Sequence, residues 1–313
     1  MSLAYLFPGQ GAQFVGMARE LYDARPDVRV LFEEASDRLG YAAAEAAFEG
    51  PDELLNSTEY TQPLLLTASV AAHAAWTAER PDAAPEFMVG LSLGEYSALV
   101  AAGSLAFGDA VALTRLRGRL MQETVPRGLG GMAAVMGLEG AEVERLCAEV
   151  RTDDAWVELA NYNSPGQLVV SGHLGAVREL CRAAKAAGAT RALVLPVSAP
   201  FHSRLLIPAG EQLAEALASV HVRDADVPVV ANVTARPVTD AAEIRRLLVR
   251  QVSTPVRLEQ SFRFLLTEGV DTFLELGPGE SMAKLLRRVA PESTAVISAG
   301  SPDTLAAAAA RVP

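Results

Sequence analysis

A serine flanked by two glycines is the residue best placed to do chemistry. Gly90-Leu91-Ser92-Leu93-Gly94 fits the pattern G-x-S-x-G and follows a short apolar run that begins at residue 86. A serine on such a strand-to-helix turn exposes its hydroxyl above the sheet edge, where the helix N-terminus favours developing negative charge. We therefore predict Ser92 as a nucleophile, with the backbone N–H of Leu93 as one oxyanion-hole donor.

A serine nucleophile needs a base, and the chain has four histidines. His202 lies in a loop at a predicted domain junction and follows Ser92 in chain order, as the serine-elbow hydrolases require. We predict that it is the base. No carboxylate near it in the sequence is obvious as its orienting group, and a backbone carbonyl could hold the imidazole tautomer instead. The other histidines are assigned no role: His73, His173 and His221.

A second glycine loop, Phe7-Pro-Gly-Gln-Gly-Ala-Gln13, follows the predicted strand Leu3–Phe7. It has no G-K-[ST] sequence, and the G-x-G-x-x-G spacing of dinucleotide-binding loops is broken at Phe14. We therefore interpret the loop as the second half of an oxyanion hole.

Three arginines stand two residues apart on one predicted helix: Arg115, Arg117 and Arg119. Neighbours at this spacing do not share a helix face, so only one of the three should point into the site. A buried guanidinium beside an acyl-enzyme would offer a fixed, bidentate partner for a substrate carboxylate.

Composition narrows the function classes. The 313 residues are 50% hydrophobic and 21% charged, which is typical of a globular chain. The net charge of −11 disfavours nucleic acid as a partner. We find no signal peptide, membrane-spanning run or metal-ligand cluster, so we expect a cytoplasmic protein without a metal. The two cysteines, Cys147 and Cys181, are predicted to be buried thiols.

Strand and helix patterns alternate along most of the chain, which predicts an α/β fold whose parallel sheet is covered on both faces. From residue 128 the pattern changes to βαββαβ, the ferredoxin-like order. We predict a large domain formed by residues 1–127 and 198–313, with a small domain, residues 128–197, inserted into it. The predicted hinges are Pro126–Gly131 and Pro196–Ser198.

Six segments in register resemble the malonyl-CoA:acyl carrier protein transacylase family, which includes stand-alone polyketide acyltransferases. They are Phe7–Gln13, Gly90–Ser97, Arg117–Gln122, Asn161–Gln167, Ser198–His202 and Leu276–Gly279. The resemblance implies an α/β hydrolase-like domain with a ferredoxin-like insert. It also implies malonyl transfer from malonyl-CoA to the phosphopantetheine thiol of an acyl carrier protein, through a malonyl-serine ester.

The resemblance also assigns roles to individual residues. Gln10 and Leu93 match the oxyanion hole, Arg117 the clamp for the malonyl carboxylate, and Gln251 the backbone carbonyl that orients His202. Further positions match residues that line the substrate pocket: Gln62, Met121, Asn163 and Phe201. Phe201 would disfavour an α-methyl group on the substrate. The family usually has histidine before the nucleophile, where this chain has Leu91.

The resemblance implies no cofactor, and we expect a monomer. Fatty acid synthesis is the favoured role. A polyketide carrier protein, a serine esterase or thioesterase on the same scaffold, and a catalytically idle interaction protein remain alternatives. An acidic enzyme needs a local basic patch to bind an acidic carrier protein. Two predicted helices offer one each: Lys284, Arg287 and Arg288 on one, and Arg245, Arg246 and Arg250 on the other.

Overall fold

The computed structural model describes residues 2–197 and 199–312, and it contains two β-sheets. The larger sheet has six strands in the order β10-β9-β1-β2-β7-β8. In that order their bounds are Ala295–Ala299, Thr272–Leu276, Leu3–Phe7, Phe87–Gly90, Val229–Ala231 and Arg236–Val238. All neighbours pair in parallel except β8, which is antiparallel to β7.

The predicted parallel sheet is confirmed for five of the six strands, and the edge strand β8 departs from it. Only four residues, 232–235, join β7 to β8, and a parallel pair needs a crossover of a dozen or more. The chain therefore turns back on itself, with Ala235 in the left-handed region at φ 52°.

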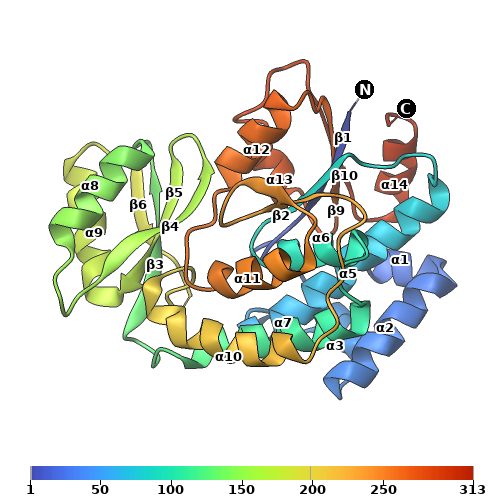
Figure 1. Ribbon diagram of the computed structural model, residues 1–313, viewed down its shortest axis with the longest axis horizontal. Coiled ribbons are helices and arrows are strands. Elements are labelled where there is room, and N and C mark those ends of the chain that lie inside the picture. Colours follow the sequence, from blue (N-terminus) through green and yellow to red (C-terminus); the bar gives the residue numbers. More distant parts are fainter. Residues whose placement is uncertain (1, 198, 313) are drawn as a thin grey trace.

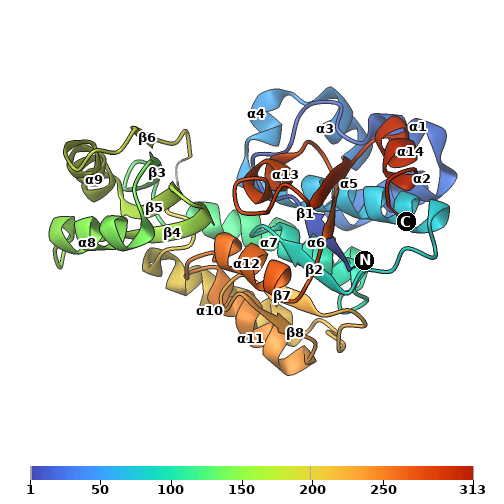
Figure 2. The ribbon, with the colours of Figure 1, turned by 90° about the horizontal axis from the view of Figure 1, so that it is seen from above.

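Helices cover both faces of the large sheet, as Figure 2 shows. Successive residues of β1 point to opposite faces: Tyr5 and Phe7 join a core with α5, while Ala4 and Leu6 join a core with α12 and α13. The helices of this part are α1 (Arg19–Ala24), α2 (Pro26–Leu39), α3 (Ala43–Glu49), α4 (Asp52–Leu55), α5 (Thr58–Glu79), α6 (Gly94–Ala101), α7 (Phe107–Glu123), α10 (Ile207–Ala218), α11 (Ala241–Gln251), α12 (Leu258–Thr267), α13 (Ser281–Leu286) and α14 (Pro302–Ala309).

The segment between Gly130 and Val194 forms a second, antiparallel sheet that stands to one side of the first (Figure 1). Its elements are β3 (Gly130–Met136), α8 (Gly140–Val150), β4 (Val157–Ser164), β5 (Gln167–His173), α9 (Leu174–Ala186) and β6 (Arg191–Val194). The strand order is β4-β5-β3-β6. This sheet and its two helices enclose their own core, which includes both buried free thiols, Cys147 and Cys181. The predicted βαββαβ order is confirmed.

Several element boundaries differ from the prediction. The sequence pattern indicates a helix from about residue 14, but α1 begins at Arg19, because Gly16 and Ala18 have positive φ values. The pattern also indicates a strand from Ala192 to Val197, whereas β6 spans Arg191–Val194. Ser198, in the second predicted hinge, lies outside the described residues. The sequence analysis missed β8, β10, α3, α4 and α14.

Candidate active site

The turn between β2 and α6 holds Ser92 in a left-handed conformation, with φ 53°. The two glycines of the motif are required by space. A Cβ on Gly90 would collide with the backbone of Gly94, and a Cβ on Gly94 would collide with the carbonyl of Phe7. The tight turn therefore brings α6 directly against β1 and leaves the Ser92 hydroxyl free to meet other elements.

Ser92 Oγ lies 2.7 Å from Nε2 of His202, so the predicted nucleophile and base are in hydrogen-bond contact. His202 also has a positive φ, 58°. Its Nδ1 lies 2.8 Å from the backbone carbonyl of Gln251 at the end of α11. With Nδ1–H donating to that carbonyl, Nε2 is left as the proton acceptor that a base requires.

Burial and the neighbouring charge of Arg117 lower the pKa of His202 to about 3. The imidazole is therefore neutral at physiological pH and ready to accept the serine proton.

Arg117 lies inside the protein beside Ser92, with 1% of its surface exposed. Its Nη2 donates to Ser92 Oγ at 3.0 Å and to Gln251 Oε1 at 3.0 Å, and its Nη1 donates to Gln62 Oε1 at 2.7 Å. All three acceptors are uncharged. Burial lowers the pKa of the guanidinium. The other two arginines of α7 turn away, since Arg115 pairs with Glu59 and Arg119 is exposed.

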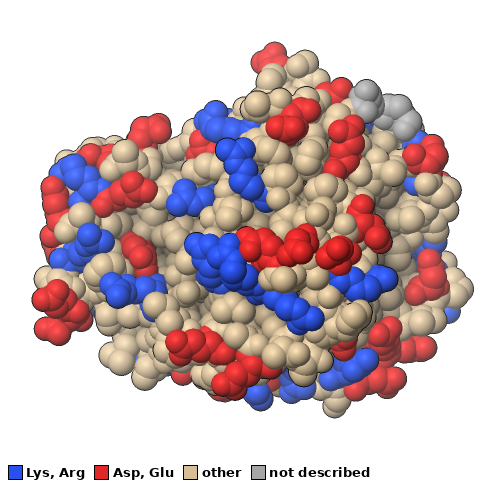
Figure 3. Space-filling model, in the orientation of Figure 1, with Lys and Arg blue, Asp and Glu red and all other residues tan. Residues whose placement is uncertain are grey.

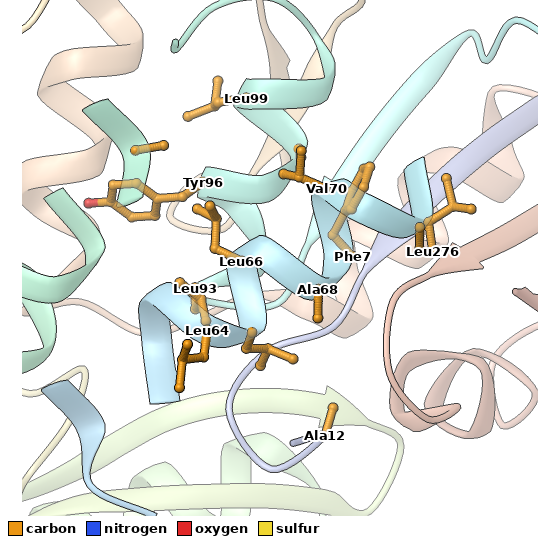
Figure 4. Close-up of a cluster of buried hydrophobic side chains, with 14 of the residues drawn as sticks. Phe7, Ala12, Leu64, Leu66, Ala68, Val70, Leu93, Tyr96, Leu99 and Leu276 are labelled. Atoms are coloured by element: carbon orange, nitrogen blue, oxygen red, sulfur yellow. The ribbon is translucent and has the colours of Figure 1, made fainter. Parts of the chain in front are cut away.

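The two predicted oxyanion donors lie on adjacent segments. The Leu91 amide donates to the Phe7 carbonyl at 3.0 Å, and a Cβ on Gly9 would collide with the Leu91 carbonyl. The loop that carries Gln10 therefore runs closely along the Ser92 turn. The Leu93 side chain is buried in the same hydrophobic core as Leu64 of α5 (Figure 4), so only its backbone is available to the site.

The remaining predicted residues are less tightly connected to Ser92. Gln62 donates to Met121 Sδ at 3.8 Å, so Met121 contacts the same glutamine that binds Arg117. Phe201 is buried next to His202 in the sequence. Asn163, on β4, shares no hydrogen bond with this group within the described chain, and its buried Oδ1 has no partner there.

The other three histidines lie elsewhere. His73 is buried against the rings of Tyr5 and Phe7, and burial lowers its pKa to about 4. His173 accepts a hydrogen bond from the Trp156 amide, and His221 is exposed.

The sequence analysis missed Asn232, which fastens the serine turn to β7. Its Oδ1 accepts from the Ser92 amide at 2.7 Å, and its Nδ2 donates to the Gly90 carbonyl at 2.7 Å. Asn232 directly follows β7, the strand that pairs in parallel with β2. A polar residue at the carboxyl end of the neighbouring parallel strand was the signal that would have found it.

Glu95, on α6, was also missed. Its Oε2 accepts from the Asn232 amide at 2.9 Å and from Gln251 Nε2 at 2.8 Å. Only 2% of the residue is exposed, and this burial raises the pKa of its carboxyl group to about 7, against the lowering effect of the two hydrogen bonds.

Gln251 contributes its side chain as well as its carbonyl. Besides the bond to Glu95, its Nε2 donates to the Ser92 carbonyl at 3.0 Å and lies 3.3 Å from Asn232 Oδ1. With Oε1 on Arg117, this one amide joins the arginine to the serine turn.

The two basic patches are partly neutralised. On α11, Arg246 pairs with Glu243, and Arg245 donates to the Leu217 carbonyl. On and after α13, Arg287 pairs with Glu280, and Arg288 donates to Gln167 of β5 at 2.6 Å. On the face in Figure 3, several basic side chains lie near the middle, and acidic side chains lie beside and below them.

Across residues 2–197 and 199–312, no cluster of three or more His, Cys, Asp or Glu side chains is arranged to hold a metal ion. Within the same ranges, no helix has the length and apolar character needed to span a bilayer.

The strand-turn-helix serine, its histidine and the buried arginine define an acyltransferase-type site, and comparison with known proteins agrees. Residues 4–308 match the acyl transferase domain family. The chain belongs to this family and, within it, to the malonyl CoA-acyl carrier protein transacylases.

Relatives support this assignment along nearly the whole chain. The malonyl CoA-acyl carrier protein transacylase of Bacillus subtilis is 45% identical over 287 residues, 92% of this chain and 90% of the relative. The solved transacylase of Coxiella burnetii is 39% identical with a TM-score of 0.97, covering 100% of this chain and 98% of that one. A malonyl-transacylase solved with a type II polyketide synthase acyl-carrier protein is 43% identical with a TM-score of 0.95, covering 99% and 100%.

Proposed function

We propose that the protein transfers a malonyl group from malonyl-CoA to the phosphopantetheine thiol of an acyl carrier protein of fatty acid synthesis. The observation that carries this proposal is the position of Arg117. A buried guanidinium whose described hydrogen bonds all end on uncharged acceptors lies against the nucleophile of a serine–histidine pair. A substrate with a carboxylate near its reacting carbonyl places a negative charge directly against this guanidinium.

The first half-reaction forms an ester on Ser92. Oγ attacks the thioester carbonyl while His202 Nε2 takes the hydroxyl proton. The backbone N–H groups of Gln10 and Leu93 stabilise the oxyanion. The Leu93 amide lies at the start of α6, where an amide has no intrahelical acceptor, and Gln10 lies in the loop after β1. The C–S bond then breaks, His202 returns the proton to the leaving thiolate, and coenzyme A departs.

The malonyl carboxylate binds the Arg117 guanidinium. The Nη2 atom of this group donates a hydrogen bond to Ser92 Oγ, so the carboxylate lies close to the reacting oxygen. Gln62 and Gln251 hold that guanidinium on its other sides. Met121, Asn163 and Phe201 complete the pocket around the acyl group in this proposal.

The second half-reaction reverses the first with a new thiol. The phosphopantetheine thiol of the carrier protein loses its proton to His202 and attacks the ester carbonyl, and Ser92 leaves with that proton. No step needs a cofactor, since the malonyl group stays at the thioester oxidation level. We propose that the protein acts as a monomer.

The two sheets supply the two sides of this site in our proposal. The larger sheet belongs to an α/β hydrolase-like domain formed by residues 1–127 and 198–313. The smaller sheet belongs to a ferredoxin-like insert formed by residues 128–197. The sheet order β4-β5-β3-β6 agrees with that arrangement.

A second carrier is supported by the similar transacylase solved with a polyketide synthase carrier protein. The two roles use the same chemistry and differ only in the acceptor. A competition assay in which malonyl-enzyme chooses between the two kinds of carrier protein, both in the phosphopantetheine form, separates them.

Mass spectrometry of the intact protein after mixing with malonyl-CoA tests the proposal directly. We expect a single adduct of about 86 Da, as a malonyl-serine ester requires, and no adduct in Ser92→Ala. Addition of a phosphopantetheinylated carrier protein should remove the adduct from the enzyme and place it on the carrier. An esterase on the same scaffold would release free malonate instead, and an idle interaction protein would form no adduct.

A further inference from the structure

The Glu95 carboxylate is buried at the point where three separate segments of the site meet. It lies three residues after Ser92, and its Oε2 accepts hydrogen bonds from the backbone of Asn232 and the side chain of Gln251. It touches neither Ser92 Oγ nor His202, so the serine–histidine chemistry described above makes no use of it.

The Gln251 amide is the structural intermediary between Glu95 and Arg117. An amide has one accepting and one donating end, and its orientation follows from its partners. Glu95 Oε2 and the Ser92 carbonyl are acceptors, so they hold the NH2 end, and the oxygen is turned toward Arg117 Nη2.

We propose that Glu95 is a positioning residue that fixes the Gln251 side chain, and that through it Glu95 sets the position of the Arg117 guanidinium. This inference rests on the proposed function, because it makes Glu95 a determinant of the preference for acyl groups that carry a carboxylate. The required property of Glu95 is an acceptor atom at a given place, and its charge is not needed.

Two conservative variants separate an acceptor role from a charge role. Glu95→Gln removes the charge but keeps an oxygen at the length needed to accept from Asn232 and Gln251. Glu95→Asp keeps the charge but is one methylene shorter, which withdraws the carboxylate from both donors. Neither variant introduces a large change in volume, so both should fold.

The readout is the ratio of kcat/KM for malonyl-CoA to kcat/KM for acetyl-CoA, with Tm measured in parallel. For Glu95→Gln we expect a ratio within about threefold of the wild type, and for Glu95→Asp a fall of about tenfold or more, since small misplacements of a positioning group are costly. The reverse pattern would overturn the inference in favour of a charge effect. A Glu95→Asp variant that loses both activities equally would reduce Glu95 to a merely structural role.

Glu275 provides the matched control. It is a second buried glutamate, on strand β9, and it accepts hydrogen bonds from the amides of Met282 and Ala283. Glu275→Asp should lower Tm by a similar amount and leave the ratio unchanged; a comparable fall in the ratio would show that destabilisation alone explains the effect. If wild-type protein forms no malonyl adduct at all, the proposed function fails. If it does and the Glu95→Asp ratio is unchanged, only the inference fails.

Discussion

The ends of β2 and β9 are two versions of the same local structure. Both strands pair in parallel with β1, and each leads through a glycine-containing turn into a helix. Each place holds a fully buried glutamate, Glu95 and Glu275, and burial raises the pKa of both to about 7.

The partners of the two carboxylates differ. Glu275 accepts hydrogen bonds from the first turn of the helix that follows its own strand, which is a local cap. Glu95 accepts from residues 137 and 156 positions later in the chain. The same group at the same depth stabilises a helix in one place and assembles a site from distant segments in the other.

Substitution of Arg117 should have the largest effect on activity of all the changes considered for the two regions. In Arg117→Ala, we expect the preference for malonyl-CoA over acetyl-CoA to fall by about two orders of magnitude, because a buried carboxylate loses its charged partner. Steady-state kinetics with both thioesters measures this. An unchanged ratio would refute the clamp, and Arg115→Ala, which alters a surface pair on the same helix, serves as the control.

Loss of the Asn232 hydrogen bonds between β7 and the serine turn should have the next largest effect on activity. Asn232→Ala leaves the Ser92 amide and the Gly90 carbonyl without their side-chain partner. We expect kcat to fall by about tenfold with little change in KM, because the nucleophile is misplaced while the clamp remains. Single-turnover formation of the malonyl-serine ester checks this. A change confined to KM would contradict the assignment of Asn232 to the nucleophile.

The pH dependence of acylation should be small on the acid side. With the pKa of His202 lowered to about 3, the base stays neutral at pH 5, so the acylation rate there should lie within about threefold of its value at pH 7. With a histidine of ordinary pKa near 6.5, the rate would fall roughly 25-fold over the same range. Quenched-flow measurements from pH 4.5 to 8 distinguish the two. The same pH profile measured with Glu95→Gln shows the behaviour of His202 without the nearby Glu95 carboxyl group.

The smallest effect on activity is expected at the β9 end. The folded-state pKa of Glu275 is raised from 4.5 to about 7, so the folded protein binds more protons between these values, and its stability falls as pH rises through them. Glu275→Gln should remove this pH-dependent loss of unfolding free energy, which is on the order of 1–3 kcal/mol. The variant should leave malonyl transfer at pH 7 unchanged. Thermal unfolding at several pH values and one kinetic assay suffice. A loss of turnover in this variant would mean that the two regions are less independent than their contacts indicate.

Much of this arrangement could be predicted from local sequence. The G-x-S-x-G turn, the loop after β1 and the single inward arginine of α7 each follow from short-range rules of spacing and backbone geometry. The βαββαβ order could also be predicted, because the period of the apolar residues changes at its boundaries.

What sequence reasoning missed depends on contacts between distant residues. Asn232 stands 140 positions from Ser92, and its place at the end of β7 becomes informative only once the pairing of β7 with β2 is known. Glu95 belongs to a recognised segment, but its function depends on the direction in which α6 turns it. Strand β10 lies at the sheet edge, where two of its five residues are only half-buried, whereas every residue of β1 and β9 is buried; its apolar pattern is therefore weaker.

The group that aligns the imidazole is a peptide carbonyl at the end of α11. No exchange of side chain can delete a main-chain oxygen, so alignment of the base tolerates any residue at position 251 that preserves the last helical turn. Chemical synthesis can reach it, since replacing the following amide nitrogen by an ester oxygen would make that carbonyl a poorer acceptor. Natural substitutions at position 251 can therefore alter the preference for the acyl group while the imidazole of His202 keeps its orientation.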